Sequence, residues 1–229
     1  DPFDGATLYA LGEMGMFRSQ AGGRDWASLD CPNCWGGPVF DPATGELLFL
    51  STDTRTIDRD AILFSSPNRG NTWHWNPDRL PAAYEGEGAG EFYVASHDGQ
   101  RWYLLTDAAP PLYISGDAGA SWQAALATVS VSMGKLALHP DGQVLYLLDE
   151  TGILRSGDAG MSWETPGDLP EDPRPGHRLA LASPSDPDTL YLGHSAEGVY
   201  RSTDGGQSFA QINTGLTNLS VNTLAIDPQ

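Results

Sequence analysis

The chain has 229 residues, of which 40% are hydrophobic, and a formal net charge of −18. It is long enough to bury a core, and its acidity disfavours nucleic acid and anionic lipid as partners. The same charge suits cations, basic protein surfaces or neutral sugars, and a salt-adapted source would account for it equally well. No apolar run reaches the length of a membrane-spanning helix. The sequence starts without a methionine or a signal peptide, as a mature or trimmed form does.

One unit of strands and turns recurs along the chain. Its most visible part is an eight-residue segment that begins with serine and ends with an aromatic residue. The first residues of its five copies are 41 to 49 positions apart. The copies are SQAGGRDW (19–26), SPNRGNTW (66–73), SGDAGASW (115–122), SGDAGMSW (156–163) and STDGGQSF (202–209). A nearly fixed period of this length predicts a repeat architecture.

Short apolar segments alternate with turns inside each repeat. In the fourth repeat, KLALHPDG (135–142) is followed by VLYLLD (144–149), by GILRS (152–156) and then by the eight-residue segment. Such segments, bounded by Gly, Pro and Asp, predict short strands joined by tight links. We therefore predict an all-β fold in a single domain over residues 1–229, a five-bladed β-propeller with four antiparallel strands per blade.

The two ends of the chain complement each other. The segment VNTLAIDPQ (221–229) is typical of an innermost strand, and DPFDGATLYALG (1–12) is typical of the second strand that would follow it. Joined together, they resemble ALASPSDPDTLYLG (180–193) inside the chain. This pattern predicts that one blade is closed by the N- and C-terminal strands. The alternative is that the chain was cut from a longer array at a repeat boundary.

The pattern S/T-x-D-x-G-x-T/S-W, which the last three copies carry most clearly, resembles the Asp-box, or BNR repeat. This repeat is found in sialidases, xyloglucan hydrolases, the sortilin lumenal propeller and the photosystem II assembly propeller. The segment GVYRSTDGGQSFAQINTGL (198–216) is similar to bacterial propellers with this repeat. The resemblance covers the whole chain, and it implies a fold much more specifically than it implies a function.

The residue types of the segment are those of a turn. Its aspartate can accept hydrogen bonds from backbone N–H groups, its glycine can adopt a positive φ, and its aromatic residue can pack between blades. We expect structural roles for Asp117, Asp158, Asp204, Trp73, Trp122, Trp163 and Phe209. The first two copies depart from the pattern, because Ala21 and Asn68 replace the aspartate and Asp25 replaces the second hydroxyl residue. One such turn per blade also keeps the carboxylates apart, which argues against a shared active site.

The segment is expected to join the third and fourth strands of each sheet. The links between the second and third strands, and between consecutive repeats, then lie on the opposite side, where a binding site is expected. The candidate residues are Trp35, Arg55, Arg59, Arg79, Tyr84, Asp149, Glu150 and His194. The longest links, 52–60 and 76–90, are where a specific site is expected.

These features favour a non-catalytic binding or assembly propeller, an accessory subunit of an exported or cell-surface complex. Its partner would be a protein or a carbohydrate on the loop side, outside the cytoplasm. The alternative is a glycoside hydrolase, sialidase-like or xyloglucanase-like, or a carbohydrate-binding propeller. A hydrolase would draw its acids and nucleophile from Asp53, Tyr84, Glu85, Glu87, Asp107 and Asp149. Against that alternative, the sialidase Phe/Tyr-Arg-Ile-Pro signature is missing, and xyloglucan hydrolases are far longer than this chain.

The only two cysteines form the motif CPNC (31–34) in a loop rich in Gly, Pro and Trp. We favour a local disulfide between Cys31 and Cys34, while free thiols and half of a metal site remain alternatives. No cofactor is expected. A ring of carboxylates at a propeller mouth would suit Ca²⁺, whereas the methionines and His194 show no tight spacing for copper.

Overall fold

The computed structural model describes residues 1, 3–12, 15–31, 38–52, 61–82, 91–94, 99–106, 110–126, 134–149, 152–170 and 177–226. Within these ranges the structure is all-β, apart from a short 3-10 helix, η1 (Pro77–Arg79). The same ranges contain no helix that is long and apolar enough to cross a membrane.

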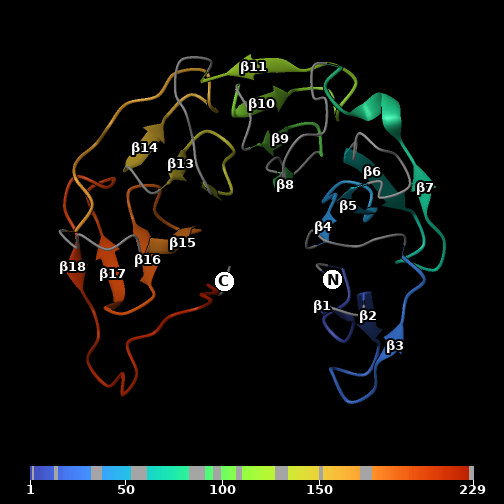
Figure 1. Cartoon of the computed structure of the whole chain (residues 1–229), viewed down its shortest axis with the longest axis horizontal. Coiled ribbons are helices and arrows are strands. Elements are labelled where there is room, and N and C mark those ends of the chain that lie inside the picture. Colours follow the sequence, from blue (N-terminus) through green and yellow to red (C-terminus); the bar gives the residue numbers. More distant parts are fainter. Residues whose placement is uncertain are drawn as a thin grey trace. The chain divides into compact units, whose positions relative to one another are not determined.

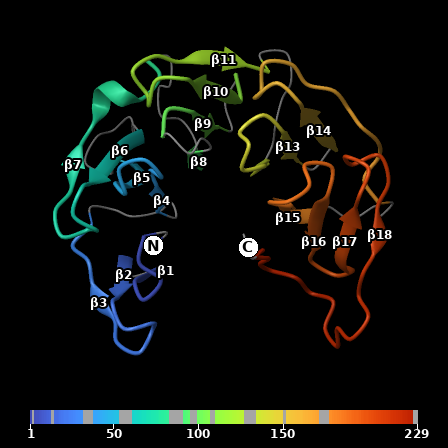
Figure 2. The same ribbon diagram turned by 180° about the vertical axis from the view of Figure 1, so that it is seen from behind.

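Five small antiparallel sheets follow one another along the chain, and neighbouring strands in each sheet are consecutive in sequence (Figure 1; seen from behind in Figure 2). The first two sheets are β1 (Leu8–Gly12), β2 (Gly15–Ser19) and β3 (Ala27–Ser28), then β4 (Val39–Phe40), β5 (Leu47–Thr52), β6 (Ala61–Ser66) and β7 (His74–Trp75). The third sheet is β8 (Glu91–Val94), β9 (Trp102–Leu105), β10 (Leu112–Ser115) and β11 (Gln123–Ala125). The last two are β12 (Lys135–Leu138), β13 (Leu145–Leu148) and β14 (Ile153–Ser156), then β15 (His177–Ala182), β16 (Leu190–His194), β17 (Gly198–Ser202) and β18 (Ala210–Gln211).

In the second, third and fifth sheets, which have four described strands, the eight-residue segments join the third and fourth strands, as the sequence predicts. We call all five segments the first to fifth turns, in chain order. The first turn joins β2 to β3, the second β6 to β7, the third β10 to β11 and the fifth β17 to β18. After the fourth turn the last strand is reduced to one bridge, in which Arg155 and Glu164 exchange backbone hydrogen bonds of 2.8 and 2.9 Å. In the three sheets with four described strands, the turn therefore lies on the side opposite the link between the second and third strands.

The chain divides into two compact units, Asp1–Ala108 with Leu112–Ala124, and Ala109–Pro111 with Ala125–Gln229. The assignment of residues 1–229 to a single domain stays a prediction. In the first unit, alternate residues of neighbouring sheets form shared cores, as expected for strands with one face against the next sheet. One core combines Met16 and Leu29 with Leu47, Phe49 and Phe64.

The second core of that unit lies between the second and third sheets. Leu48, Leu50 and Leu63 pack with Trp102 and Leu104, and Trp122 of the third turn lies against them. In the other unit, Tyr146, Leu148 and Ile153 of the fourth sheet pack with Leu190 and Leu192 of the fifth. Phe209 of the fifth turn packs against this cluster. Trp73 of the second turn packs in the same way against the core of the first two sheets, so the aromatic ends of three turns contribute to cores between sheets.

The first sheet has three described strands, where the second, third and fifth have four. Its outermost described strand, β1, exposes Leu8 and Leu11 to 40% and 37%. Residues 221–226 are not in a strand. Val221 donates a hydrogen bond to the carbonyl oxygen of His194, so this segment begins beside the end of β16. The predicted strand pairing between the chain ends is not seen in the described residues and stays a prediction.

Candidate functional site

The fourth turn shows how the repeated segment is built. The Ser156 hydroxyl donates to Asp158 at 2.8 Å and accepts a hydrogen bond from the N–H of Gly160 at 2.8 Å. Asp158 also accepts from the N–H of Ser162 at 2.8 Å and from its hydroxyl at 2.6 Å. Two of these four bonds satisfy backbone N–H groups that a tight turn leaves without strand partners, and the other two join the side chains. The aspartate is thus engaged within its own turn.

The third and fifth turns repeat this network. Asp117 accepts from Ser121, and Asp204 accepts from Ser208, each through the N–H and the hydroxyl. Hydrogen bonds from the nearby serine hydroxyl and backbone N–H lower the pKa of Asp158 to about 2, and the same cause lowers that of Asp204 to about 2. The pKa of Asp117 is lowered for the same reason. These carboxylates are therefore stabilised as anions for a structural purpose.

The first two turns keep part of this network. In the second turn, Asn68 accepts from the N–H of Thr72 at 2.9 Å and donates to its hydroxyl at 2.8 Å, so the amide replaces the carboxylate. In the first turn Ala21 offers no acceptor, and the Ser19 hydroxyl alone accepts from the N–H groups of Ala21 and Gly23. Loss of the aspartate therefore removes bonds without changing the turn.

The fourth residue of each turn adopts a positive φ, which the sequence analysis did not anticipate. Only two of these residues are glycines: the values are 62° for Gly22, 60° for Arg69, 55° for Ala118, 61° for Ala159 and 72° for Gly205. The left-handed conformation is unfavourable for residues with a Cβ atom. The hydrogen-bond network of the turn must therefore offset this strain at three positions.

Arg79, one of the residues expected in the binding site, contacts the third turn, and its binding role stays a prediction. Its guanidinium donates two hydrogen bonds, of 3.1 and 3.0 Å, to the carbonyl oxygen of Ala118 in the third turn. It also lies 4.1 Å from the ring centre of Trp102 and 3.6 Å from a carboxylate oxygen of Glu46. The Trp122 indole donates to the Arg79 carbonyl at 3.1 Å. Arg79 therefore fastens the link after the second sheet to the turn of the third.

His194, another expected loop-side residue, is 1% exposed. Its Nδ1 accepts hydrogen bonds from the N–H groups of Ala196 at 3.1 Å and Glu197 at 2.9 Å. His194 therefore shapes the link between β16 and β17 from inside, and its expected binding role stays a prediction.

The link between β16 and β17 is held rigidly by the segment that follows β18. Asn213 donates to the carbonyl oxygen of Glu197 at 2.7 Å and accepts from the N–H of Val199 at 2.8 Å. Gly198 lies between them with φ 89°, and a Cβ atom there would be 2.1 Å from the Asn213 side-chain oxygen. The Glu197 carboxylate accepts from the hydroxyl of Tyr200. Together these contacts build a fixed corner on the loop side of the fifth sheet.

An exposed apolar segment begins at this corner. Within fifteen residues the sequence places four apolar side chains that are 36–45% exposed, namely Ile212, Leu216, Leu219 and Ile226. Two backbone hydrogen bonds anchor the segment. The N–H of Gly198 donates to the carbonyl oxygen of Leu219 at 2.8 Å, and the N–H of Leu216 donates to the carbonyl oxygen of Asn213 at 2.9 Å. We call residues 212–219, with Ile212, Leu216 and Leu219, the apolar loop segment. Anchored exposed apolar side chains are a common feature of protein-binding surfaces.

Most of the other predicted site residues lie outside the described part of the chain. These are Trp35, Asp53, Arg55, Arg59, Tyr84, Glu85, Glu87, Asp107 and Glu150. Of the six hydrolase candidates only Asp149 is described, and it accepts from the N–H of Gly152 at 3.0 Å at the tip of the link between β13 and β14. The separation of a carboxylate pair, which a hydrolase requires, is therefore not tested.

Cys31 is disulfide-bonded. Cys34, the other cysteine of the sequence, lies outside the described residues, so the pairing between them stays a prediction. Among the residues the structure describes, no three or more His, Cys, Asp or Glu side chains are grouped as metal ligands. The calcium alternative stays a prediction for the rest of the chain.

The chain matches no protein-family model and no curated protein sequence. It is similar in structure to the GH74 xyloglucanase from Xanthomonas campestris (TM-score 0.63, 21% identity, covering 92% of this chain and 37% of that one). It is also similar to YCF48 bound to D1 peptide (TM-score 0.62, 16% identity, covering 97% of this chain and 70% of that one). A third similar structure is PorZ of the type-IX secretion system of Porphyromonas gingivalis (TM-score 0.62, 14% identity, covering 93% of this chain and 26% of that one). The chain thus spans little more than a third of the first of these proteins. At these identities the similarity concerns the fold, and the five small sheets are consistent with a β-propeller.

Proposed function

We propose that this chain is a non-catalytic propeller of the Asp-box type that binds a protein partner through its loop side. The observation that carries the proposal is the apolar loop segment, whose Leu216 and Leu219 are exposed yet anchored to the corner built by Glu197 and Asn213. A preorganised apolar surface loses little conformational entropy on binding. The charged groups described nearby are engaged in the fold, because Glu197 holds Tyr200 and His194 is buried.

Two of the similar structures support a binding role. One is described as YCF48 bound to D1 peptide, and PorZ is described as a bacterial surface component of a secretion system. By analogy, we propose a place outside the cytoplasm for this chain and a role as an accessory subunit of a complex. The acidic net charge would steer a basic partner surface toward it.

We further propose that the five sheets close into a ring in which residues 221–229 add a strand to β1. The first sheet has one described strand fewer than its neighbours, and Leu8 and Leu11 of β1 are exposed. The terminal segment supplies Leu224 and Ile226 at alternate positions, as a strand with one buried face requires. Pairing would cover apolar side chains of both segments and remove an open sheet edge.

A glycoside hydrolase is the second candidate, and the similarity to xyloglucanases favours it. It needs two carboxylates about 5 to 10 Å apart beside a sugar-sized pocket. The candidates would be Asp149 and the acids of the undescribed loops, Asp53, Glu85, Glu87 and Asp107. Incubation with xyloglucan and with sialosides, followed by measurement of released sugar, tests this function. We expect no release; release that Asp149→Asn abolishes would establish the hydrolase and contradict our proposal.

Site-specific cross-linking in the organism of origin tests the binding function directly. A photoreactive amino acid is placed at Leu216, and at Met161 as the matched control, because Met161 is 57% exposed but lies in the fourth turn. We expect one or a few defined protein adducts from position 216 and none of these from position 161. The same adducts from both positions, or none from position 216, would contradict the proposal.

A further inference from the structure

The apolar loop segment lies in the middle of a long stretch of sequence without charge. No Asp, Glu, Lys, Arg or His occurs between Asp204 and Asp227, although 18% of all residues in the chain are charged. This stretch contains the end of the fifth turn, β18 and the whole apolar loop segment. The surface that the segment presents therefore differs in charge from the rest of an acidic protein.

Uncharged polar side chains separate the exposed apolar ones. Thr214 and Thr217 lie between Ile212, Leu216 and Leu219, and all five residues are exposed. A threonine hydroxyl donates and accepts hydrogen bonds without carrying a charge. The segment therefore combines apolar contact area with neutral hydrogen-bonding groups.

Part of the backbone of the segment is unpaired. Leu216 and Leu219 use one backbone group each in the two anchoring hydrogen bonds. Within the described residues, the N–H and C=O groups of Thr214, Gly215 and Thr217 have no hydrogen-bond partner. A partner that buries these groups has to supply hydrogen bonds of its own, because burying an unpaired peptide group is unfavourable. Another peptide backbone offers one donor and one acceptor per residue, which is the matching set.

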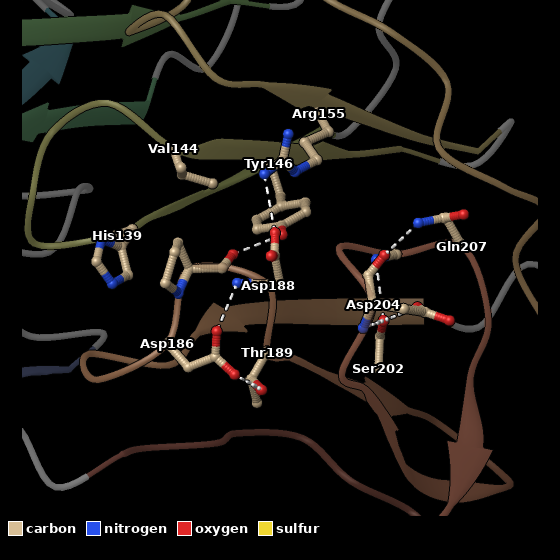
Figure 3. A network of polar contacts seen from close by, with 12 residues as sticks. His139, Val144, Tyr146, Arg155, Asp186, Asp188, Thr189, Ser202, Asp204 and Gln207 are labelled. Carbon is tan, nitrogen blue, oxygen red and sulfur yellow. Dashed lines mark hydrogen bonds and ion pairs between the residues drawn. The ribbon is translucent and has the colours of Figure 1, made fainter.

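A charged partner group would find no counter-charge in the segment. Asp204, the charged residue before the stretch, accepts a hydrogen bond of 2.7 Å from the Ser202 hydroxyl within its own turn (Figure 3). At the corner where the segment begins, the Glu197 carboxylate accepts a hydrogen bond from Tyr200. A charge placed against the apolar side chains would therefore lose hydration without gaining an ion pair, which is unfavourable. The segment thus discriminates against charged side chains.

We propose that the partner contacts the apolar loop segment through an extended, uncharged stretch of its own chain. Apolar side chains of this stretch pack against Leu216 and Leu219, and its backbone pairs with the free groups of Thr214, Gly215 and Thr217. The inference rests on the proposed binding function and specifies the chemistry of the partner. The acidic net charge would still steer a basic protein from a distance, but the contact itself does not depend on charge.

Selection of short random peptides displayed on phage, with the full chain as the target, tests the inference without knowledge of the partner. Peptides are kept if they bind the natural chain and Met161→Asp but do not bind Leu216→Asp/Leu219→Asp. Met161 is the matched control, because it is 57% exposed and lies in the fourth turn. Both variants are used at temperatures below their unfolding midpoints. We expect the kept peptides to be rich in apolar residues and poor in charged ones.

Two opposite charges at Thr217 then show whether the contact is neutral. The Kd of a kept peptide, carrying a fluorescent label, is measured for the natural chain, Thr217→Asp and Thr217→Lys. We expect both substitutions to raise Kd about fivefold or more, because a charge of either sign has to be desolvated. Thr217→Ser, which keeps the hydroxyl, should change Kd less than about twofold. For the natural chain, Kd should change less than about twofold between about 0.05 and about 0.5 M salt.

The pairing of the peptide backbone is tested with N-methylated versions of the same peptide. We expect methylation of at least one backbone nitrogen to raise Kd about fivefold, because it removes a hydrogen-bond donor. No effect at any position would overturn the backbone pairing.

The possible outcomes separate this inference from the proposed function on which it rests. Kept peptides rich in Lys or Arg, bound more tightly by Thr217→Asp and more weakly by Thr217→Lys or at high salt, would overturn the inference and leave the proposed function standing. The absence of any peptide that depends on Leu216 and Leu219 would overturn both.

Discussion

The fourth and the first turns have the same backbone course but very different hydrogen bonding. In the fourth turn, Asp158 and Ser156 share four side-chain bonds, whereas in the first turn Ser19 acts without an aspartate. Both nevertheless follow directly on a strand, β2 in the first sheet and β14 in the fourth, and place a glycine at a positive φ. The turn therefore forms with or without the aspartate, which only adds to its stability. This behaviour is expected of a structural residue and not of a catalytic residue that every repeat would need.

The largest expected effect separates a tightly packed turn from a loosely packed one. At Gly119, with φ 85°, a Cβ atom would lie 2.7 Å from Trp102 and 2.8 Å from the Arg79 carbonyl oxygen. At Gly23, with φ 84°, the nearest atom is 3.5 Å away. We expect Gly119→Ala to lower the free energy of unfolding by about 3 kcal/mol or more, and Gly23→Ala by about 1 kcal/mol. Denaturant unfolding measures both; equal losses would show that packing around the two turns does not differ.

A smaller effect is expected from the serines that begin the turns. Ser156→Ala leaves the N–H of Gly160 without its acceptor and removes a donor to Asp158, while Ser19→Ala removes acceptors only. We expect losses of about 2 and about 1 kcal/mol in the free energy of unfolding. Because both serines are buried, water does not easily replace the lost bonds. A greater loss of unfolding free energy for Ser19→Ala than for Ser156→Ala would contradict the expectation that each hydrogen bond of the turn adds to stability.

Low pH should destabilise the third, fourth and fifth turns, which contain the aspartate, more than the first two turns, which lack it. The folded-state pKa of Asp158 is about 2, below its ordinary value of 3.8, so its contribution to stability is present above about pH 4 and is lost as the pH falls toward 2. We expect Asp158→Asn to flatten the decline of the unfolding midpoint between pH 4 and pH 2, and Asn68→Asp to steepen it. Asn68 shows that an amide fits this position. An unchanged pH profile for both variants would contradict the assigned cause of the low pKa.

The smallest effect concerns the fourth turn residue. Ala118 and Ala159 already occupy this position at φ values of 55° and 61°, and a Cβ atom at Gly22 would meet nothing within 4 Å. We therefore expect Gly22→Ala to cost about 1 kcal/mol or less in denaturant unfolding. A loss as large as that of Gly119→Ala would mean that the first turn is confined by contacts like those of Gly119.

The repeat period and the residue types of the turns were enough to predict the sheets. The strand order, the place of the eight-residue turns and the roles of Asp117, Asp158 and Asp204 follow from short-range chemistry that recurs in each copy. Ring closure is a long-range property, and neither the exposed edge of β1 nor the terminal segment alone determines it.

The contacts of individual side chains could not be predicted from the sequence. Arg79 lies in a link expected on the loop side, yet its long side chain extends to Ala118 and Trp102. His194 has a typical loop position, but its imidazole turns inward to accept backbone N–H groups. The apolar loop segment was missed because exposure depends on packing that composition does not reveal.

The central claim is that the turns form a scaffold and the apolar loop segment binds a protein. It is tested by comparing Leu216→Asp/Leu219→Asp with Asp158→Ala in the organism of origin, measuring both the co-purified partner and the unfolding midpoint of each variant. We predict that the first variant loses the partner at an unchanged midpoint, while the second has a lower midpoint and keeps the partner. Retention of the partner by the first variant together with its loss from a still-folded Asp158→Ala would contradict the account.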